Sequence, residues 1–278
     1  MTHTLPFEIE VTACPICATR ERERTFLDQQ LPARFVRCAG CSSVYLNPRP
    51  AAAPRAAYYQ RTDRALPSQL RVAESRRTAF RAIASALLRY QHAGACLDVG
   101  CGPGALFEHL PRTSWRCHGI EPDPDLAAYA ASAHGARVHA GTLDDAPFTS
   151  AQFDLVTLID TLYLLPDPLA ALRKIHGLLR PGGVLGLEFA GQRYMLCRSV
   201  GPLNYLLEGR WSRLRADGRH LYFFTPRGIE TLLSMAGFTA LEWTPLPGPG
   251  HRLFRLAARC SFRLTTDCPK LLCVAART

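Results

Sequence analysis

The sequence has no apolar run of transmembrane length and no secretion signal. The N-terminus, MTHTLPFEIE, lacks the basic start and the apolar stretch of a signal peptide. No segment offers the roughly 20 consecutive apolar residues that a membrane-spanning helix needs. These absences predict a cytoplasmic chain without a membrane span. With 278 residues, of which 47% are hydrophobic and 20% charged, there is room for one α/β domain of ordinary size and a small appendage.

Lysine is also scarce, because only Lys174 and Lys270 stand among the 33 basic residues. Residues 1–95 hold 14 Lys and Arg against 7 Asp and Glu, residues 96–190 hold 6 against 11, and residues 191–278 hold 13 against 5. An acidic centre therefore lies between two basic flanks. Such flanks attract nucleic acid or an anionic small molecule, or they form a solvated arginine surface, and composition leaves these alternatives open.

Cysteine, in contrast, is abundant, with 11 residues. Without a secretion signal, a disulfide framework is not expected. Two pairs, CPIC and CAGC, give the spacing C-x2-C-x20-C-x2-C, which places four thiolates at the corners of a tetrahedron. A closed site of four sulfurs favours a structural Zn²⁺ over a catalytic one, since no position is left for water or substrate. The predicted ligands are Cys14, Cys17, Cys38 and Cys41.

A glycine-rich turn in the segment CLDVGCGPG, Cys96 to Gly104, predicts a ligand site. A short apolar strand carrying Asp98 ends in Gly100, Gly102 and Gly104, and the turn is thereby stripped of side chains so that a ligand can lie against backbone. The next strand ends in Glu121, where an acid can bind both hydroxyls of a ribose. The spacing is GxGxG, whereas dinucleotide sites use GxGxxG.

Strands and helices alternate through the rest of the chain, which predicts a doubly wound α/β sheet. We expect a long amphipathic helix over 68–92, helices at 103–110, 124–133 and 168–179, and a further helix that starts after Thr225 and ends at Gly237. Seven strands are expected at 96–99, 116–120, 137–140, 153–159, 183–189, 239–245 and 270–276.

The glycine turn, with Asp98 two residues before its first glycine, resembles motif I of the class I S-adenosylmethionine-dependent methyltransferases. The turn Pro181-Gly182-Gly183 before the fifth strand is a second match. Together with the cysteine pairs and the following NPRP, the chain is similar to zinc-ribbon-bearing methyltransferases of bacterial sugar and natural-product tailoring. The resemblance implies a Rossmann-like seven-stranded sheet with a small N-terminal zinc ribbon. We expect a ribbon over 1–50, a linker and helices over 51–92, and a methyltransferase domain over 93–278 with a cap insertion at 190–224.

The resemblance also implies roles for individual residues in S-adenosylmethionine binding. The acid and the glycines of the turn would surround the methionine part, Glu121 would bind the ribose, and Asp160 ends the fourth motif. The usual adenine-binding acid aligns with Thr142, so the adenine contact falls to backbone at Thr142 and Leu143 or to Asp144 reaching back. The implied cofactor set is Asp98, Gly100, Gly102, Gly104, Glu121, Thr142, Leu143, Asp144 and Asp160.

For the catalytic base, the sequence offers several candidates. Many relatives carry Glu-His shortly after the acid that here is Asp160, and this chain has Tyr163-Leu164 instead. His220, which precedes aromatic residues and a helix start, is the first candidate, and a histidine hydrogen-bonded inside the cap is the alternative. Tyr163, Tyr194, Tyr205 and Tyr222 are secondary candidates, and Tyr58 and Tyr59 are candidates for closing over the cofactor.

Three functions follow. The first is methyl transfer to the carbon, oxygen or nitrogen of a small molecule, with a cap whose arginines (193, 198, 210, 213 and 215) hold an anionic acceptor. The second is RNA methylation, with the ribbon and the basic flanks as the RNA-binding surface. The ribbon, however, has no run of lysines or stacking aromatics, and an Asp-Pro-Pro-Tyr-like signature is missing. The third is a protein that binds the cofactor without turnover.

Overall fold

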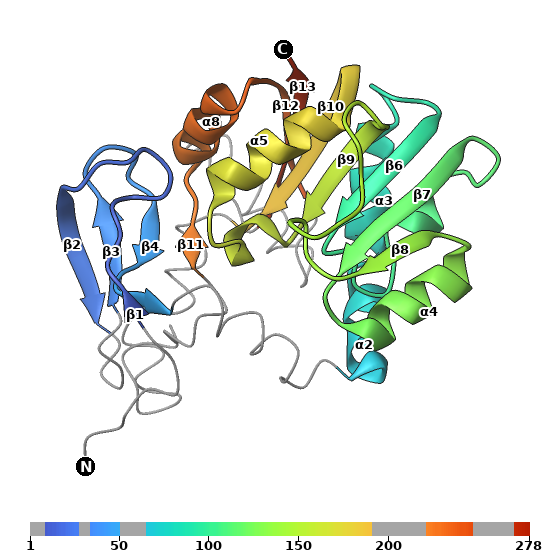
Figure 1. The fold of residues 1–278 in the computed structure, drawn as a ribbon, viewed down its shortest axis with the longest axis horizontal. Coiled ribbons are helices and arrows are strands. Elements are labelled where there is room, and N and C mark those ends of the chain that lie inside the picture. Colours follow the sequence, from blue (N-terminus) through green and yellow to red (C-terminus); the bar gives the residue numbers. More distant parts are fainter. Residues whose placement is uncertain (1–8, 28–33, 51–64, 191–220, 247–269) are drawn as a thin grey trace, which may run out of the picture.

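The computed structural model describes residues 9–27, 34–50, 65–190, 221–246 and 270–278. These residues form one large sheet with helices on both faces and, beside it, a smaller β-structure built by the N-terminal residues (Figure 1). No helix within the described ranges is long and apolar enough to cross a membrane.

The large sheet has seven strands, as predicted, in the order β12-β13-β10-β9-β6-β7-β8. Its strands are β6 (Gly94–Val99), β7 (Trp115–Glu121), β8 (Arg137–Ala140), β9 (Phe153–Ile159), β10 (Leu179–Phe189), β12 (Phe238–Pro245) and β13 (Leu271–Arg277). The strands from β6 to β10 pair in parallel, and β13 is antiparallel to both of its neighbours.

Alternating side chains divide the core between the two faces of the sheet. On β6, Ala95 and Leu97 join one buried cluster, and Cys96 between them belongs to the other. The two-sided burial of near-continuous apolar strands is what a parallel sheet covered by helices requires. Helix α3 lies so close to β10 that a Cβ on Gly186 would come within 2.6 Å of Leu87.

Five helices surround the sheet in the described part of the chain, and the last of them begins after its predicted cap, Thr225. They are α2 (Leu66–Ser75), α3 (Arg77–Leu87), α4 (Pro124–His134), α5 (Pro168–Leu178) and α8 (Pro226–Met235), together with the 3₁₀ turns η1 (Phe107–His109) and η2 (Leu162–Leu164). The side chains of Asp123, Asp167 and Thr225 cap α4, α5 and α8 by accepting backbone N–H groups of the first turn.

Two helix predictions are wrong. The expected helix 103–110 is reduced to the turn η1, because Gly104 has a φ of +83°, outside the right-handed helical region. The expected single helix over 68–92 is two helices, α2 and α3, which meet at Arg76, where φ is −103° and ψ is 4°.

The N-terminal residues form what we call the four-cysteine module, residues 9–27 and 34–50. It contains the pair β1 (Ile9–Glu10) and β5 (Arg49–Pro50), and a second sheet in the order β11-β4-β3-β2. That sheet consists of β2 (Arg22–Leu27), β3 (Arg34–Cys38), β4 (Val44–Leu46) and β11 (Tyr222–Phe223). One of its four strands therefore comes from near the other end of the chain.

Candidate functional site

One edge of the large sheet gathers the predicted cofactor residues. Because β6, β7, β9 and β10 run parallel, their carboxyl ends meet at this edge. The antiparallel β13 brings its amino end to the same place, where Leu271 pairs with Phe189 of β10. In open α/β sheets this edge is the usual place for a ligand.

The three glycines of the turn have different physical roles. All have positive φ, at 75° for Gly100, 55° for Gly102 and 83° for Gly104. A Cβ on Gly100 would lie 2.6 Å from the hydroxyl of Thr161, and one on Gly104 would lie 2.5 Å from the ring of His134. A Cβ on Gly102 would meet nothing within 4 Å. Packing therefore explains two of the glycines, whereas Gly102 faces open space that a ligand can fill.

Glu121 lies at the end of β7 and is fixed against the glycine turn. Its side chain is buried, and its two carboxylate oxygens accept the N–H groups of Gly102 at 2.9 Å and of Asp123 at 3.1 Å. Glu121 lies at the strand end, as predicted, and its hydrogen bond with Gly102 connects the carboxylate to the open part of the turn.

Asp98 lies inside the sheet. It is 3% exposed, and its carboxylate accepts a 2.7 Å hydrogen bond from the hydroxyl of Thr157 on the neighbouring β9. Burial raises the pKa of Asp98 to about 7, the Thr157 hydroxyl opposes that rise, and the charge of Glu121 adds to it. The Asp98 side chain therefore links β6 to β9 by a side-chain hydrogen bond beneath the glycine turn.

The loop after β8, where the adenine contact is predicted, is held by Asp145. The carboxylate of Asp145 accepts the Thr142 N–H at 2.7 Å and pairs with His139 at 2.9 Å. Asp144 takes a different part: its side chain is exposed, and its carbonyl accepts from Lys174 at 3.0 Å. Leu143 is buried. The acid that reaches back to Thr142 is therefore Asp145, one residue beyond the expected one.

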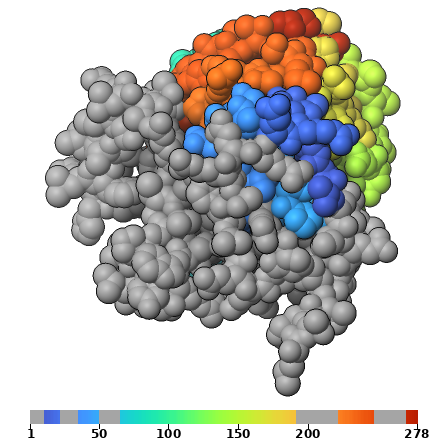
Figure 2. All heavy atoms as spheres, turned by 90° about the vertical axis from the view of Figure 1, so that its left-hand side faces the viewer, coloured from blue at the N-terminus to red at the C-terminus, as the bar shows by residue number. Residues whose placement is uncertain are grey.

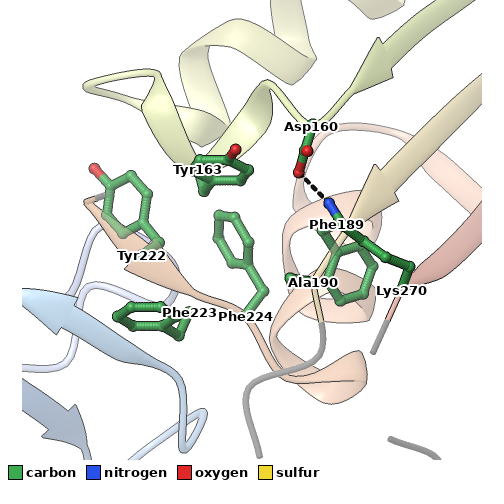
Figure 3. Close-up of a pocket in the computed structure, with 8 residues that line it drawn as sticks. All are labelled: Asp160, Tyr163, Phe189, Ala190, Tyr222, Phe223, Phe224 and Lys270. Atoms are coloured by element: carbon green, nitrogen blue, oxygen red, sulfur yellow. Dashed lines mark hydrogen bonds and ion pairs between the residues drawn. The ribbon is translucent and has the colours of Figure 1, made fainter. Parts of the chain in front are cut away.

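A cavity of about 310 Å³ lies beside this edge, at the ends of β9 and β10 (Figure 3). Most of its lining is aromatic, with Phe189 and Phe224 edge-to-face at 6.3 Å and Tyr222 stacked on Phe224 at 5.4 Å. The lining residues are Asp160, Tyr163, Phe189, Ala190, Tyr222, Phe223, Phe224 and Lys270. Volume and lining are typical of a pocket for a small organic molecule.

Four charged side chains meet at the polar corner of the pocket. Lys270 pairs with Asp160 and lies 3.1 Å from a carboxylate oxygen of Glu188, whose side chain is completely buried. Arg76, at the break between α2 and α3, reaches Asp160 at 3.0 Å and Glu188 at 3.1 Å through different guanidinium nitrogens. The two positive and two negative charges balance, so these four residues present no net positive charge to an acceptor.

The methyltransferase-domain family matches residues 72–242, which is more than half of the chain. This chain belongs to that family. The match contains the glycine turn, Glu121 and Asp160 in their expected order. The protein is an S-adenosylmethionine-dependent methyltransferase.

Curated relatives agree with the family. The methyltransferase is similar to the ubiquinone biosynthesis O-methyltransferase of Xanthomonas axonopodis pv. citri, at 31% identity over 185 residues, covering 63% of this chain and 74% of the relative. The enzyme of the same name from Xanthomonas oryzae pv. oryzae is 36% identical over 186 residues, with coverage of 63% and 74%.

Two solved structures share the fold at lower identity. One is the Burkholderia thailandensis 1,6-didemethyltoxoflavin-N1-methyltransferase with bound 1,6-didemethyltoxoflavin and S-adenosylhomocysteine, at a TM-score of 0.57 and 19% identity, covering 91% of this chain and 98% of that one. The other is a complex of the Haloferax volcanii Trm112 methyltransferase activator and a putative methyltransferase, at 0.54 and 20% identity, covering 73% and 90%.

The methyltransferase keeps its predicted metal ligands together in the four-cysteine module. The four cysteine sulfurs lie within 4.8 Å of one another, with Cys14 to Cys41 at 3.7 Å and Cys17 to Cys38 at 3.4 Å. A zinc tetrahedron with Zn–S bonds of about 2.3 Å has sulfur–sulfur edges of about 3.8 Å. Sulfurs joined in a disulfide would be about 2.05 Å apart. The spacing therefore fits a shared metal ion.

Both cysteine pairs adopt the same backbone turn. The N–H of the residue four positions after the first cysteine returns to that cysteine's carbonyl, from Ala18 to Cys14 at 2.8 Å and from Ser42 to Cys38 at 3.1 Å. Ala18 and Ser42 both have a φ of +59°. Two knuckles with the same turn, each supplying two cysteines, suit a four-sulfur metal site.

Of the predicted catalytic residues, the structure describes Tyr163 but not His220. Tyr163 lines the pocket, and burial, followed by the charges of Asp160 and Glu188, raises its pKa well above the usual value for a tyrosine. A phenol with a raised pKa keeps its proton at neutral pH and is a poor base. His220, Tyr58, Tyr59, Tyr194, Tyr205 and the five arginines expected to hold an anionic acceptor lie outside the described residues.

Sequence reasoning missed Arg76, Glu188 and Lys270. Two of them carried a signal: Glu188 is the single acid in the buried strand segment VLGLEF, and Lys270 is one of two lysines in the chain. Arg76, one arginine among 31, carried none. An acid in a fully apolar strand needs a partner, since an unpaired buried charge is costly. The partners come from residues 76 and 270, and only the fold brings these together.

Proposed function

We propose that the methyltransferase transfers the methyl group of S-adenosylmethionine to a small molecule held in the aromatic pocket at the ends of β9 and β10. The observation that carries the proposal is the open face of Gly102, on the same sheet edge as the pocket. A donor lying on that face and an acceptor in the pocket would meet at the carboxyl end of β9, next to Asp160.

For the donor, we propose the residues that the resemblance implied, with changes at the adenine end. The open glycine turn holds the methionine part and Glu121 binds the ribose. Adenine lies against the backbone of Thr142 and Leu143, with Asp145 in place of Asp144 as the acid that shapes this loop. Asp98 lies beneath the glycine turn and supports it through its hydrogen bond with Thr157 of β9. Asp160 lies between the donor site and the acceptor pocket.

For the acceptor, the aromatic lining favours a flat or largely apolar molecule that stacks on Phe189, Phe224 or Tyr163. The sulfonium donor is already activated, so in-line positioning and exclusion of water supply much of the acceleration. Asp160, the carboxylate that lines the pocket, can accept a hydrogen bond from an acceptor O–H or N–H, and Tyr163 can donate one. His220 remains a candidate base from the sequence alone.

We further propose that the four cysteines hold a structural Zn²⁺. The sulfur distances, the two matching knuckles and the all-thiolate donor set fit zinc, and a closed four-sulfur site leaves no position for substrate. Metal analysis of the purified protein should give one zinc per chain. Zinc of less than half an equivalent, with a different transition metal in its place, would contradict this assignment.

The decisive experiment measures transfer of labelled methyl from S-adenosylmethionine into fractions of a cell extract. Label in the low-molecular-weight fraction, resistant to ribonuclease, is expected. Label in RNA would overturn the small-molecule acceptor while keeping methyl transfer. Tight binding of S-adenosylmethionine without label in any fraction would overturn turnover itself. An exposed-residue variant, Arg20→Met, serves as the activity control.

A further inference from the structure

The four-cysteine module and the acceptor pocket share a strand. β11 pairs antiparallel with β4, with Tyr222 opposite Tyr45 and Phe223 opposite Val44. The Leu46 N–H donates to the carbonyl of Leu221 at 2.9 Å and extends this pairing. Figure 2 shows the module, in blue, directly against residues 221–246, in orange. Both residues of β11, together with the following Phe224, form one wall of the pocket (Figure 3).

A two-residue strand has little stability of its own, so its neighbours fix its position. On the pocket side, the Leu221 N–H donates to the carbonyl of Tyr163 at 3.0 Å. The hydroxyl of Tyr222 donates to the carbonyl of Pro166 at 2.6 Å. Both acceptors belong to the segment that follows β9, so β11 is held between the module and the end of β9.

Arg49 of the module also connects β11 to the segment after β9. Its Nη1 donates to the carbonyl of Pro166 at 2.7 Å and to the hydroxyl of Tyr222 at 2.6 Å. Arg49 is 9% exposed, and a buried guanidinium with these two acceptors is costly to remove because the acceptors then lose a charged donor. Arg49 therefore fixes the ring of Tyr222 at a set distance from β9.

The cysteine knuckle lies against the other end of the wall. The hydroxyl of Thr225 donates to the carbonyl of Cys41 at 3.1 Å, and the Thr225 N–H donates to the hydroxyl of Ser43 at 3.3 Å. A Cβ on Gly228 would lie 2.3 Å from that hydroxyl, so α8 approaches the knuckle as closely as a glycine allows. The cysteines of the module also share one hydrophobic cluster with Tyr222, Phe223 and Phe224.

We propose that the four-cysteine module is part of the acceptor site: the metal-bound knuckle and Arg49 hold the aromatic wall Tyr222–Phe224, and Arg49 is a positioning residue for acceptor selection. The role of the pocket rests on the proposed function, whereas the coupling of module to wall does not. Loss of the metal would then loosen the pocket wall and leave the glycine turn intact, because β6 and β7 share no strand with the module.

The test compares amide hydrogen exchange, followed by mass spectrometry, in the full-length wild type and in Cys38→Ser with its zinc content measured. Loss of the metal should lower protection of the peptide 221–225 by about tenfold or more, the equivalent of one or two lost hydrogen bonds. Protection of 94–99 should fall by a smaller factor than that of 221–225, because β6 shares no strand with the module. Unchanged protection of 221–225 in the metal-free variant would overturn the proposal.

Two further variants leave the metal ligands intact. Arg49→Met and Tyr222→Phe should both loosen 221–225 while zinc stays bound. With an acceptor from the labelled fraction, they should raise its KM more than they lower kcat, with an unchanged Kd for S-adenosylmethionine. Arg20→Met, the same type of change at an exposed site in the module, is the matched control. Equal losses in donor and acceptor binding would show general damage and reject the positioning role.

If no acceptor is labelled, the proposed function fails and the exchange result still decides the coupling. If methyl transfer is found but 221–225 does not respond to metal loss or to Arg49→Met, the coupling fails and the proposed function stands.

Discussion

Single residues in this methyltransferase divide into those that the fold needs and those that it leaves open for a ligand. Gly100 and Gly102 illustrate this, since they are two positions apart in one motif and both have positive φ. The fold excludes a side chain at Gly100, because Thr161 occupies the space, and tolerates one at Gly102. Sequence alone cannot separate them, because both are glycine in the same pattern.

Gly102→Asn should therefore weaken donor binding without unfolding the protein. Asparagine adopts a positive φ at little cost, and its side chain would occupy the space assigned to the donor. We expect the Kd for S-adenosylmethionine, measured by calorimetry, to rise at least about tenfold, or 1.4 kcal/mol. Gly100→Asn should instead lower the melting temperature. Wild-type affinity in Gly102→Asn would contradict the placement of the donor.

Asp98 should give the protein a stability that falls as pH rises. Burial raises the pKa of Asp98 to about 7 from an ordinary value of 3.8, so the native state keeps a proton between these values that the unfolded chain has lost. Native protein then binds more protons, and the free energy of unfolding decreases with rising pH across this window, by at most about 4 kcal/mol.

Asp98→Asn removes this titration while keeping an acceptor for the Thr157 hydroxyl. Urea unfolding at pH 5 and pH 8 should show a smaller loss of stability in the variant than in the wild type. The difference between the two proteins isolates Asp98 from other titrating groups. If the stability of the variant changes with pH as much as that of the wild type, Asp98 is not the cause of the pH dependence.

At the scale of elements, the break between α2 and α3 places Arg76 beside the two acids at the sheet edge. The Arg76 guanidinium bridges Asp160 after β9 and Glu188 in β10, and it also lies 5.1 Å from the ring centre of Phe80. A continuous helix was predicted because the apolar periodicity runs through the break. Apolar periodicity indicates which side of a helix faces the sheet. It does not indicate where two acids, distant in the sequence, require a cation.

Arg76→Ala should destabilise the protein by roughly 3 kcal/mol, since removing one partner leaves the buried Glu188 with fewer cations. Arg76→Lys should recover only part of this loss, because one ammonium replaces two separate guanidinium contacts. Arg77→Ala is the matched control: its pairs with Glu74 and Glu108 are exposed, and we expect a change within about 0.5 kcal/mol. Equal effects at both positions, measured by chemical denaturation, would refute the bridging role.

At the scale of the whole molecule, the N-terminal module and the large sheet share a core. Phe35 and Tyr45 of the module belong to the same hydrophobic cluster as Leu172 and Ile229 of α5 and α8. A boundary near residue 50 follows from composition, because the prolines and cysteines change there. The contribution of β11 to the module's sheet means that the two parts are joined by strand pairing as well as by the chain.

Metal removal should therefore destabilise more than the module. With a strong chelator, or in Cys38→Ser, we expect the melting temperature to fall by more than about 5 °C, which corresponds to roughly 2 kcal/mol for a chain of this size. Differential scanning calorimetry of zinc-loaded and zinc-free protein checks this. An unchanged melting temperature after verified loss of zinc would rule out a structural metal.

The sequence by itself determined the seven-stranded sheet, the glycine turn, the strand-end acid Glu121 and the cysteine pairs. These features are local: strand burial, a turn without side chains and paired knuckles each lie within a few neighbouring residues, where spacing dictates geometry.

Only the tertiary structure decided the pocket, the charge cluster of Arg76, Glu188 and Lys270, and the strand shared between β4 and β11. Arg76 precedes Lys270 by 194 residues, and Leu46 at the end of β4 precedes Tyr222 of β11 by 176. No periodicity or spacing records such pairings, because their partners are selected by burial and by charge balance after the elements have packed.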